Sequence, residues 1–473
     1  MTFFNHHPSF FAVVATIVLA LFSNGCDVIH SASTQEKSII PDHPPNRPNL
    51  ERIPELFIYT NSKITSNYTK AYFYFFDSKK HFSYFSPTEN FEDFGYIKNR
   101  GNSTAMSSKK PYNIKFEEKQ NFFGMGKAKK WVLLSNPFDP TLIRNKLIYD
   151  LASNLSFVFS PKSYFIDVWL NNIFMGNYQI SEKIEFQGSR IPYDIDKGDF
   201  LFELIESEVR NDTNDVYFRT PIDSFRITLK EPENPTPEQT NDFLKKIKSI
   251  EKSIATKKFT EYVRYVDLKS IIDYYWIEEF VNDSDLHTGS VFFSIHNGIL
   301  ISGPVWDFDL SLGNTVSATK ASTNNFTAKK LWWEKIFQDS IFQKIAYERY
   351  LQIEPYFDNL VNDNKLGTNK IDSILDFFHD SFHRNFSDSG WAYCDTLEIN
   401  DNQERRQLSC PYNPIPLPTF DENIHFLKEW IIKRNQYLKQ TASRKLDELN
   451  HIDITLERAL VIQDSIFRNK SIF

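Results

Sequence analysis

Cysteine is scarce in this chain: only three occur among 473 residues, and they form no Cys-x-x-Cys or mixed Cys/His spacing. Structural zinc sites commonly use such spacings, so the sequence argues against one. Glycine is also rare, at 14 residues, which argues against collagen-like and glycine-rich repeat architectures. Basic residues are not in excess, because 54 Lys and Arg stand against 61 Asp and Glu. The net charge of −7 argues against nucleic acid as the main ligand.

The remaining composition is that of a folded protein, with 41% hydrophobic and 24% charged residues. A length of 473 residues suggests two or three domains. Residues 31–54 combine Ser, Thr and charged residues with five prolines, which predicts an extended tether without a core. Folded structure is therefore expected from about Leu56. A second proline cluster, at residues 411–418, precedes an amphipathic helix predicted at residues 421–438.

The N-terminus has the pattern of an export signal. Residues 9–22 are uncharged and mostly apolar, a run that is short for a membrane-spanning helix but typical of a signal-peptide core. The run leads to Ser23-Asn24-Gly25-Cys26, which resembles a bacterial lipoprotein signal with Cys26 as the lipidated first residue. We therefore expect a signal peptide at residues 1–25 and a membrane-anchored lipoprotein of the cell envelope. Ordinary secretion and an uncleaved anchor stay open as alternatives.

The other two cysteines, Cys394 and Cys410, lie sixteen residues apart. In an exported protein this pair could close one disulfide. Two unpaired thiols are equally compatible with the sequence.

Local patterns predict a mixture of strands and helices. Strands are predicted at residues 111–116, 164–170, 174–184 and 201–205. Asn171 and Asn172 separate the middle two strands and tolerate the positive φ of a tight hairpin turn. A helix is predicted at residues 142–155, with Asp139 or Thr141 as its N-cap. Another is predicted at residues 268–281, capped by Asp267.

The most informative segment follows that second helix. Residues 282–290 have no periodicity and form an acidic loop that contains Asp285. Residues 291–301 form a predicted hairpin around an Asn-Gly turn, and the chain then reaches Asp307 and Asp309. Helix, acidic loop, hairpin and acidic pair follow one another in the order that protein kinases use to bring two carboxylates to one phosphate chain.

Phosphoryl transfer explains why two carboxylates would be needed. One carboxylate orients the attacking hydroxyl and accepts its proton, and another holds the magnesium that bridges the phosphates. Asp285 occupies the first position in this order, and Asp307 and Asp309 occupy the second. Five residues after Asp285, where protein kinases have a metal-binding Asn, stands Ser290, which also offers an oxygen.

Several blocks of the chain resemble the CotH kinase family, which is named from a spore-coat protein and describes atypical, extracytoplasmic protein kinases. The most specific block is Gly303-Pro304-Val305-Trp306-Asp307-Phe308-Asp309 with Gly313-Asn314. The other matching blocks are residues 100–104, 110–116, 131–136, 139, 142–147, 177–184, 427–430 and 434. Their common order over most of residues 56–440 carries the resemblance.

The resemblance implies an α+β, reduced kinase-like fold with two lobes that bind ATP between them. A small β-rich N-lobe is expected at residues 56–185, a larger and mostly helical C-lobe at 186–350, and a helical extension at 351–473. Asp285 would be the catalytic carboxylate, and Asp307, Asp309 and Ser290 would hold Mg²⁺ or Mn²⁺.

The resemblance also suggests residues that contact the nucleotide, each with a structural alternative. Lys115 occupies the position of a phosphate-binding lysine but could be an exposed strand-end charge. Arg144 could contact phosphate or pair with Asp139. Arg100 could grip a phosphate in a bidentate manner or belong to a turn held by its neighbours.

Two further residues, Glu182 and Trp306, also have both a functional and a structural interpretation. Glu182 is placed like a hinge residue, although a strand-end salt bridge would also explain it. Trp306 fits a core position or a nucleotide platform. The chain departs from ordinary kinases because it lacks a Gly-x-Gly-x-x-Gly loop. The helix around Arg144 also offers no obvious Glu partner for Lys115.

Three functions are compatible with these features. The first is an exported, membrane-tethered kinase that uses ATP and a divalent metal to phosphorylate Ser or Thr of surface or envelope proteins. The second is a non-catalytic protein that uses the same fold for surface binding or envelope assembly. The third, a carbohydrate-active enzyme that uses Asp307 and Asp309, is disfavoured because their spacing does not define a glycosidase separation.

Overall fold

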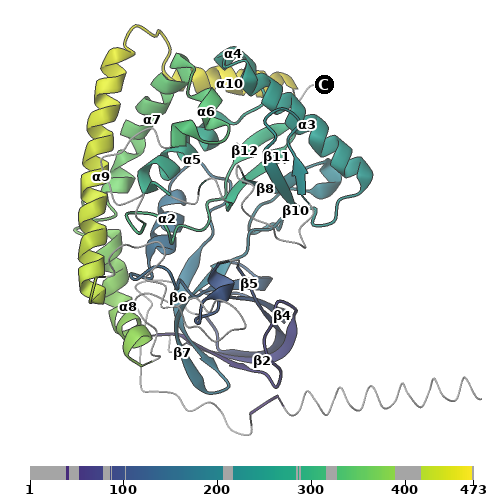
Figure 1. Ribbon diagram of the computed structural model, residues 1–473, viewed down its shortest axis with the longest axis vertical. Helices are drawn as coiled ribbons and strands as arrows, with labels where there is room; N and C mark the ends of the chain where they lie inside the picture. Colours follow the sequence, from purple (N-terminus) through teal and green to yellow (C-terminus); the bar gives the residue numbers. More distant parts are fainter. Residues whose placement is uncertain are drawn as a thin grey trace, which may run out of the picture.

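The computed structural model describes residues 39–41, 53–77, 86, 88–101, 103–205, 217–283, 286, 289–315, 327–388 and 417–470. These residues form a mixed α+β fold with a β-barrel at one end and a second sheet with most of the helices at the other (Figure 1). The long helix α9 (Phe420–Glu448) runs beside both parts. None of the helices in these ranges is long and apolar enough to cross a membrane.

The barrel consists of seven strands in the order β1-β2-β3-β4-β5-β7-β6. Their bounds are β1 Glu55–Tyr59, β2 Thr69–Phe76, β3 Phe91–Asn99, β4 Tyr112–Gln120, β5 Ala128–Leu134, β6 Ser163–Leu170 and β7 Ile173–Glu182. Strands β1 and β6, at the two ends of this order, close the barrel by pairing in parallel. All other neighbouring strands of the barrel pair antiparallel. The expectation of a mixed fold is confirmed, but the N-terminal region is a closed barrel rather than a simple kinase lobe.

Aromatic side chains fill much of the barrel. Phe75, Phe91, Phe116 and Phe122 surround one another with ring centroids 5.0–5.9 Å apart. Trp131 packs on Phe122 and is fully buried. Offset and edge-to-face contacts of this kind add to the free energy gained from burying the rings. Aromatic residues make up 16% of the chain, and part of them therefore form this core.

The predicted hairpin of β6 and β7 is confirmed, together with its turn. Asn171 and Asn172 have φ values of 48° and 65°, in the left-handed region that Asn tolerates. The strand predicted at residues 111–116 is confirmed by β4, which begins one residue later, at Tyr112. Strand β1 begins at Glu55, close to the expected start of folded structure at Leu56.

The second sheet has the order β12-β11-β8-β10-β9. Its strands are β8 Phe200–Ile205, β9 Tyr217–Arg219, β10 Arg226–Glu231, β11 Val291–His296 and β12 Ile299–Ser302. Helix α3 (Pro237–Ala255) covers one face, where Phe243 packs on Phe200 and Phe202 of β8. Helix α5 (Leu268–Val281) packs Tyr274 against Phe293 of β11 on the same side. The opposite face includes polar side chains of β8 and β10, among them Glu203, Arg226 and Lys230.

The predicted helices are confirmed, with shifted ends in two cases. Helix α5 has the predicted bounds, and Asp267 caps it by accepting a hydrogen bond from Ser270 N. Helix α2 (Arg144–Ala152) is shorter than expected because Leu142 has a φ of 62°, which a helix cannot include. Helix α9 extends beyond the predicted residues 421–438.

Helices α6 (Trp333–Ile336), α7 (Ser340–Asp358), α8 (Lys370–Ser387) and α10 (Leu456–Lys470) complete the helical part, together with the short α4 (Phe259–Tyr262). Helix α7 packs along α9, and α8 packs against β7 of the barrel. The 3₁₀ turns are η1 (Thr104–Met106), η2 (Ile195–Lys197) and η3 (Thr327–Lys329).

Candidate functional site

A cavity of about 250 Å³ lies between the barrel and the polar face of the second sheet. Its walls come from the chain after β3, the chain after β5, strands β8 and β10, and the segment that follows β12. The charged side chains among its lining residues are Arg100, Glu203, Arg226, Lys230, Asp307 and Asp309.

The acidic side of the cavity contains three of the predicted metal-binding residues. Asp307 has a φ of 70°, a left-handed conformation that is uncommon outside glycine and occurs at functional sites. Its Oδ2 accepts a hydrogen bond of 3.0 Å from Ser290 Oγ. Asp309 is buried and lines the same cavity. The structure thus brings Ser290, Asp307 and Asp309 together.

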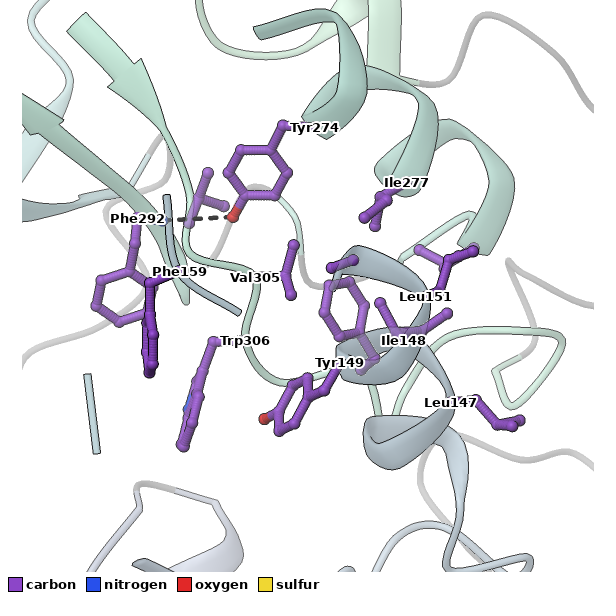
Figure 2. Close-up of a cluster of buried hydrophobic side chains, with 14 of the residues drawn as sticks. Leu147, Ile148, Tyr149, Leu151, Phe159, Tyr274, Ile277, Phe292, Val305 and Trp306 are labelled. Atoms are coloured by element: carbon purple, nitrogen blue, oxygen red, sulfur yellow. Dashed lines mark hydrogen bonds between the residues drawn. The ribbon is translucent and has the colours of Figure 1, made fainter. Parts of the chain in front are cut away.

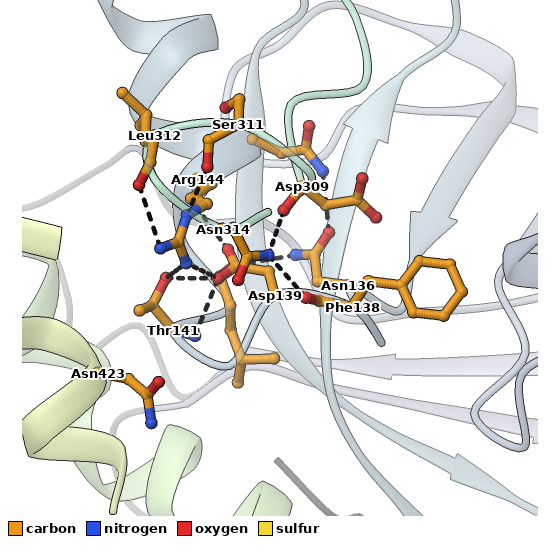
Figure 3. Close-up of polar contacts among 12 residues, drawn as sticks. Asn136, Phe138, Asp139, Thr141, Arg144, Asp309, Ser311, Leu312, Asn314 and Asn423 are labelled. Carbon is orange, nitrogen blue, oxygen red and sulfur yellow. Dashed lines mark hydrogen bonds and ion pairs between the residues drawn. The ribbon is translucent and has the colours of Figure 1, made fainter. Parts of the chain in front are cut away.

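A network of amides holds the segment that carries the two aspartates. Phe308 N donates to Asn145 Oδ1 at 2.7 Å, and Asn145 Nδ2 donates to Asn136 Oδ1 at 3.1 Å. Asn314 Nδ2 donates to the backbone oxygens of Asp309 and Phe138, at 2.5 and 2.8 Å (Figure 3). These contacts fix the backbone between the two carboxylates to helix α2 and to the chain after β5.

Arg144 contacts the chain just after the two aspartates. Its guanidinium is buried and forms an ion pair with Asp139. It also donates to the carbonyl oxygens of Ser311 and Leu312, at 3.1 and 3.4 Å (Figure 3). Asp139 Oδ2 also accepts a hydrogen bond of 2.8 Å from Arg144 N, the first residue of α2. The N-cap of α2 is Ile143, so Asp139 binds a backbone N–H of the first turn without being the N-cap. Arg144 is absent from the described lining of the cavity, and its pairing with Asp139 is the structural alternative considered above.

Arg100 lies in the cavity wall, near Asp307. Its backbone N donates to Pro111 O at 3.1 Å, and Gly101 follows with a φ of 82°. A Cβ at Gly101 would lie 2.1 Å from Thr104 Oγ1, so this turn requires glycine. Within the described part of the chain, the Arg100 guanidinium has no hydrogen-bond or ion-pair partner. Burial lowers the pKa of Arg100, and the nearby Asp307 carboxylate opposes this shift, so the side chain stays charged.

Trp306 contacts both Arg100 and a residue of helix α2. The Arg100 guanidinium lies 5.4 Å from the Trp306 ring centroid. Trp306 also stacks on Tyr149 of α2, with centroids 5.5 Å apart and an interplanar angle of 20° (Figure 2). Burial raises the pKa of Tyr149 well above its ordinary value, so the phenol stays neutral. Trp306 is therefore a core residue that also lines the cavity.

The second sheet contributes cations that the sequence reasoning missed. Arg226, Thr228 and Lys230 line the cavity, while the alternating Ile227 and Leu229 are buried. Side chains at every second position of a strand share a face, so this alternation was the available signal. What the sequence could not indicate was that the polar face meets Asp307.

Lys230 is paired with an acidic residue of the neighbouring strand. Its Nζ lies 2.9 Å from Glu203 Oε2 of β8. Glu203 Oε1 accepts a hydrogen bond of 2.6 Å from Ser290 N, at the acidic side of the cavity. The Glu203 carboxylate therefore contacts both Lys230, on the basic side of the cavity, and Ser290, on the side of the predicted metal ligands.

Lys115 and Glu182 lie elsewhere among the described residues. Lys115 is exposed on β4, paired in register with Tyr96 of β3 and Lys130 of β5. Glu182, at the end of β7, accepts a hydrogen bond of 2.9 Å from Lys162 N and lies 3.9 Å from Arg190 Nε. Burial raises the pKa of Glu182 to about 7. Neither residue belongs to the cavity lining, which matches the structural alternatives for both.

Four predicted residues, Asp285, Cys26, Cys394 and Cys410, lie outside the described residues, and their roles stay predictions. The residues that are described fit a hard divalent cation, because Asp307, Asp309 and Ser290 offer only oxygen ligands. Mg²⁺ and Mn²⁺ prefer such donors.

Two comparisons with known proteins bear on the identity of the chain. A search of curated proteins found no match. A family model described as CotH kinase protein matches residues 97–438, a range that includes every residue lining the cavity. The match covers most of the chain, and the protein therefore belongs to the CotH kinase family.

Proposed function

We propose that the protein is an atypical kinase that binds ATP with Mg²⁺ or Mn²⁺ in this cavity and transfers the γ-phosphoryl group to Ser or Thr of other proteins. Membership of the CotH kinase family supports a kinase-like activity. The observation that carries the proposal is the meeting of Arg100, a guanidinium without a described partner, with the oxygen ligands Asp307, Asp309 and Ser290 in one cavity. The barrel would act as the small lobe and the second sheet with its helices as the large lobe.

The cations of the cavity suit a triphosphate. Arg100 comes from the barrel side, and Arg226 and Lys230 come from the second sheet. Guanidinium groups bind phosphate oxygens through parallel hydrogen bonds, and several positive charges around one polyphosphate stabilise the charge that shifts during transfer. We assign Lys230 the phosphate contact expected of Lys115, because Lys230 has the acidic partner that a kinase lysine uses.

Asp307, Asp309 and Ser290 would hold the cation. A divalent ion bound there would neutralise phosphate charge. The hydrogen bond from Ser290 orients the Asp307 carboxylate, and the amide network fixes the backbone that carries it. Preorganised groups of this kind lower the barrier because they need little rearrangement during reaction. Asp285, five residues before Ser290, would orient the acceptor hydroxyl and take its proton.

The setting of this activity is the cell envelope. The predicted export signal and the predicted lipidation of Cys26 support a tethered protein whose substrates are surface or envelope proteins. A non-catalytic member would retain nucleotide binding without transfer, and the experiment below separates the two.

The test is phosphate transfer by the purified full-length chain with labelled ATP and Mg²⁺ or Mn²⁺, on itself and on generic protein acceptors. We expect labelled Ser or Thr, and a loss of at least about 100-fold in Asp307→Asn, the size typical for removing one transition-state stabilising group. Glu118→Gln, on the exposed face of β4, is the matched control and should retain activity. Nucleotide binding without transfer would identify a pseudokinase. Absence of binding would contradict the proposal.

A further inference from the structure

A second group of metal-binding side chains lies away from the cavity, where α8 meets the start of α9. His379 and His383 are one helical turn apart on α8, and Asp421 lies in the first turn of α9. One ligand atom from each of the three residues lies within 4.8 Å of the other two. We propose that His379, His383 and Asp421 bind a divalent transition-metal ion, with Zn²⁺ as the preferred ion.

The distances between the ligand atoms fit one ion. The two Nε2 atoms lie 3.0 Å apart, and they lie 3.6 and 3.7 Å from the same Asp421 Oδ1. Tetrahedral zinc bonds of 2.0–2.1 Å place neighbouring ligand atoms about 3.3 Å apart. The three observed separations therefore lie within about 0.4 Å of a tetrahedral edge, which leaves one position for water.

The chemistry of the donors selects the class of ion. Imidazole nitrogen binds Zn²⁺, Co²⁺, Ni²⁺ and Cu²⁺ in preference to Mg²⁺, which takes oxygen ligands. This group thus differs from the all-oxygen set at Asp307 and should not compete for the same cation. The Nδ1 of His379 lies 3.6 Å from Asp380, so a carboxylate stands near the ring nitrogen that would not bind the ion.

The ligands are held on rigid elements although they are partly exposed. Phe420, beside Asp421, is fully buried and packs on Phe382, with ring centroids 5.7 Å apart, and on His383 at 5.3 Å. A capping box between Thr419 and Glu422 fixes the first turn of α9. The apolar contact and the cap set the position of Asp421 before any ion binds, which lowers the entropy cost of binding.

An ion here would tie the two sides of the cavity together. On α8, Ser381 Oγ donates to Asp167 Oδ1 of the barrel at 2.6 Å. On α9, Arg434 forms a buried ion pair with Glu279 of α5, at 3.2 Å. Because α8 is anchored to the barrel and α9 to the helical part, a bond between them would restrain their relative position.

The structural alternative is a histidine–histidine hydrogen bond beside an aspartate that only complements the helix N-terminus. Metal uptake by the full-length chain decides between the two. The chain should carry an affinity tag without histidine and be stripped with a chelator. Co²⁺ is then titrated in, with visible absorption as the readout, and Zn²⁺ is added as a competitor.

We expect His379→Gln and His383→Gln each to take up one equivalent of Co²⁺ fewer than the unmodified chain. His425→Gln removes an exposed histidine of α9 that pairs with Glu429 and lies outside the group, so it should retain full uptake. Zn²⁺ should raise the Tm of the unmodified chain and not that of the two α8 variants.

Co²⁺ uptake that is undiminished in both α8 variants would overturn the proposal. The same holds if the unmodified chain shows no saturable uptake, or if Zn²⁺ raises the Tm of all variants equally.

Discussion

Two arginines lie near the segment that carries Asp307 and Asp309, and they differ in their surroundings. Arg144 is buried, pairs with Asp139 and donates to two carbonyl groups. Arg100 lines the cavity, lies over Trp306 and has no hydrogen-bond or ion-pair partner among the described residues. Both were candidates for nucleotide contact, and only one of them has donors left to offer a ligand.

The difference follows from the cost of burying charge. A buried guanidinium must be paired and hydrogen-bonded, because the lost hydration is otherwise not replaced. Arg144 meets that condition with groups of the protein itself. Arg100 retains access to solvent through the cavity, so a ligand can supply the partner. Nearness to a motif does not distinguish a charged side chain that stabilises the protein from one that can bind a ligand. The hydrogen bonds that the side chain makes within the protein distinguish them better.

The largest effect on stability is expected from Arg144→Met. The substitution leaves the Asp139 carboxylate buried without its cation, which typically costs about 3–5 kcal/mol of unfolding free energy. Denaturant unfolding measures this loss. Arg219→Met, on the exposed strand β9, is the control and should change stability little. A loss of unfolding free energy below about 1 kcal/mol in Arg144→Met would contradict the claim that the Arg144–Asp139 pair stabilises the fold.

Arg100→Gln is expected to produce the opposite pattern. Losing a charge-assisted hydrogen bond to phosphate costs about 1.5–3 kcal/mol, which corresponds to roughly a 10- to 150-fold rise in KM for ATP. The midpoint of denaturant unfolding should not fall, because the guanidinium has no hydrogen bond to lose among the described residues. Unchanged ATP kinetics together with lost stability would contradict the comparison.

Glu182 is intermediate between Arg144, which is fully paired, and Arg100, which has no such partner among the described residues. Its carboxyl group is buried, and a cation, Arg190 Nε, lies 3.9 Å away. Burial raises its pKa to about 7 from the ordinary 4.5, so the folded state binds the proton more tightly than the unfolded state. Its contribution to stability is therefore complete below pH 4.5 and is lost as pH rises toward 7. In Glu182→Gln, Tm should fall less between pH 4.5 and 7.5 than in the unmodified chain. Parallel Tm profiles for the two proteins would refute this assignment.

Local elements could be predicted from the sequence because neighbouring residues determine them. Asp267 caps α5, and the Asn171-Asn172 turn sets the β6–β7 hairpin, within a few residues of chain. The acidic half of the site was also predictable, since Ser290 and Asp307 flank a single hairpin, β11–β12.

The basic half depends on pairings that the sequence does not show. Lys115 and Lys230 both lie on strands, and only the closure of the barrel and the register of β10 on β8 decide which face each one occupies. In this register Lys230 reaches Glu203 and the cavity, whereas Lys115 points to the surface. Sheet geometry is therefore the reason that we propose Lys230, and not Lys115, for the phosphate contact.

The most direct test of the account is a calorimetric titration of ATP into the full-length chain, with and without Mg²⁺ or Mn²⁺. The account predicts binding that strengthens with the cation, and an Asp307→Asn variant in which the cation no longer has an effect. Glu118→Gln should bind as the unmodified chain does. Binding that is unaffected by a chelator, or equal cation dependence in Asp307→Asn, would contradict the central claim that this cavity holds a metal–nucleotide pair.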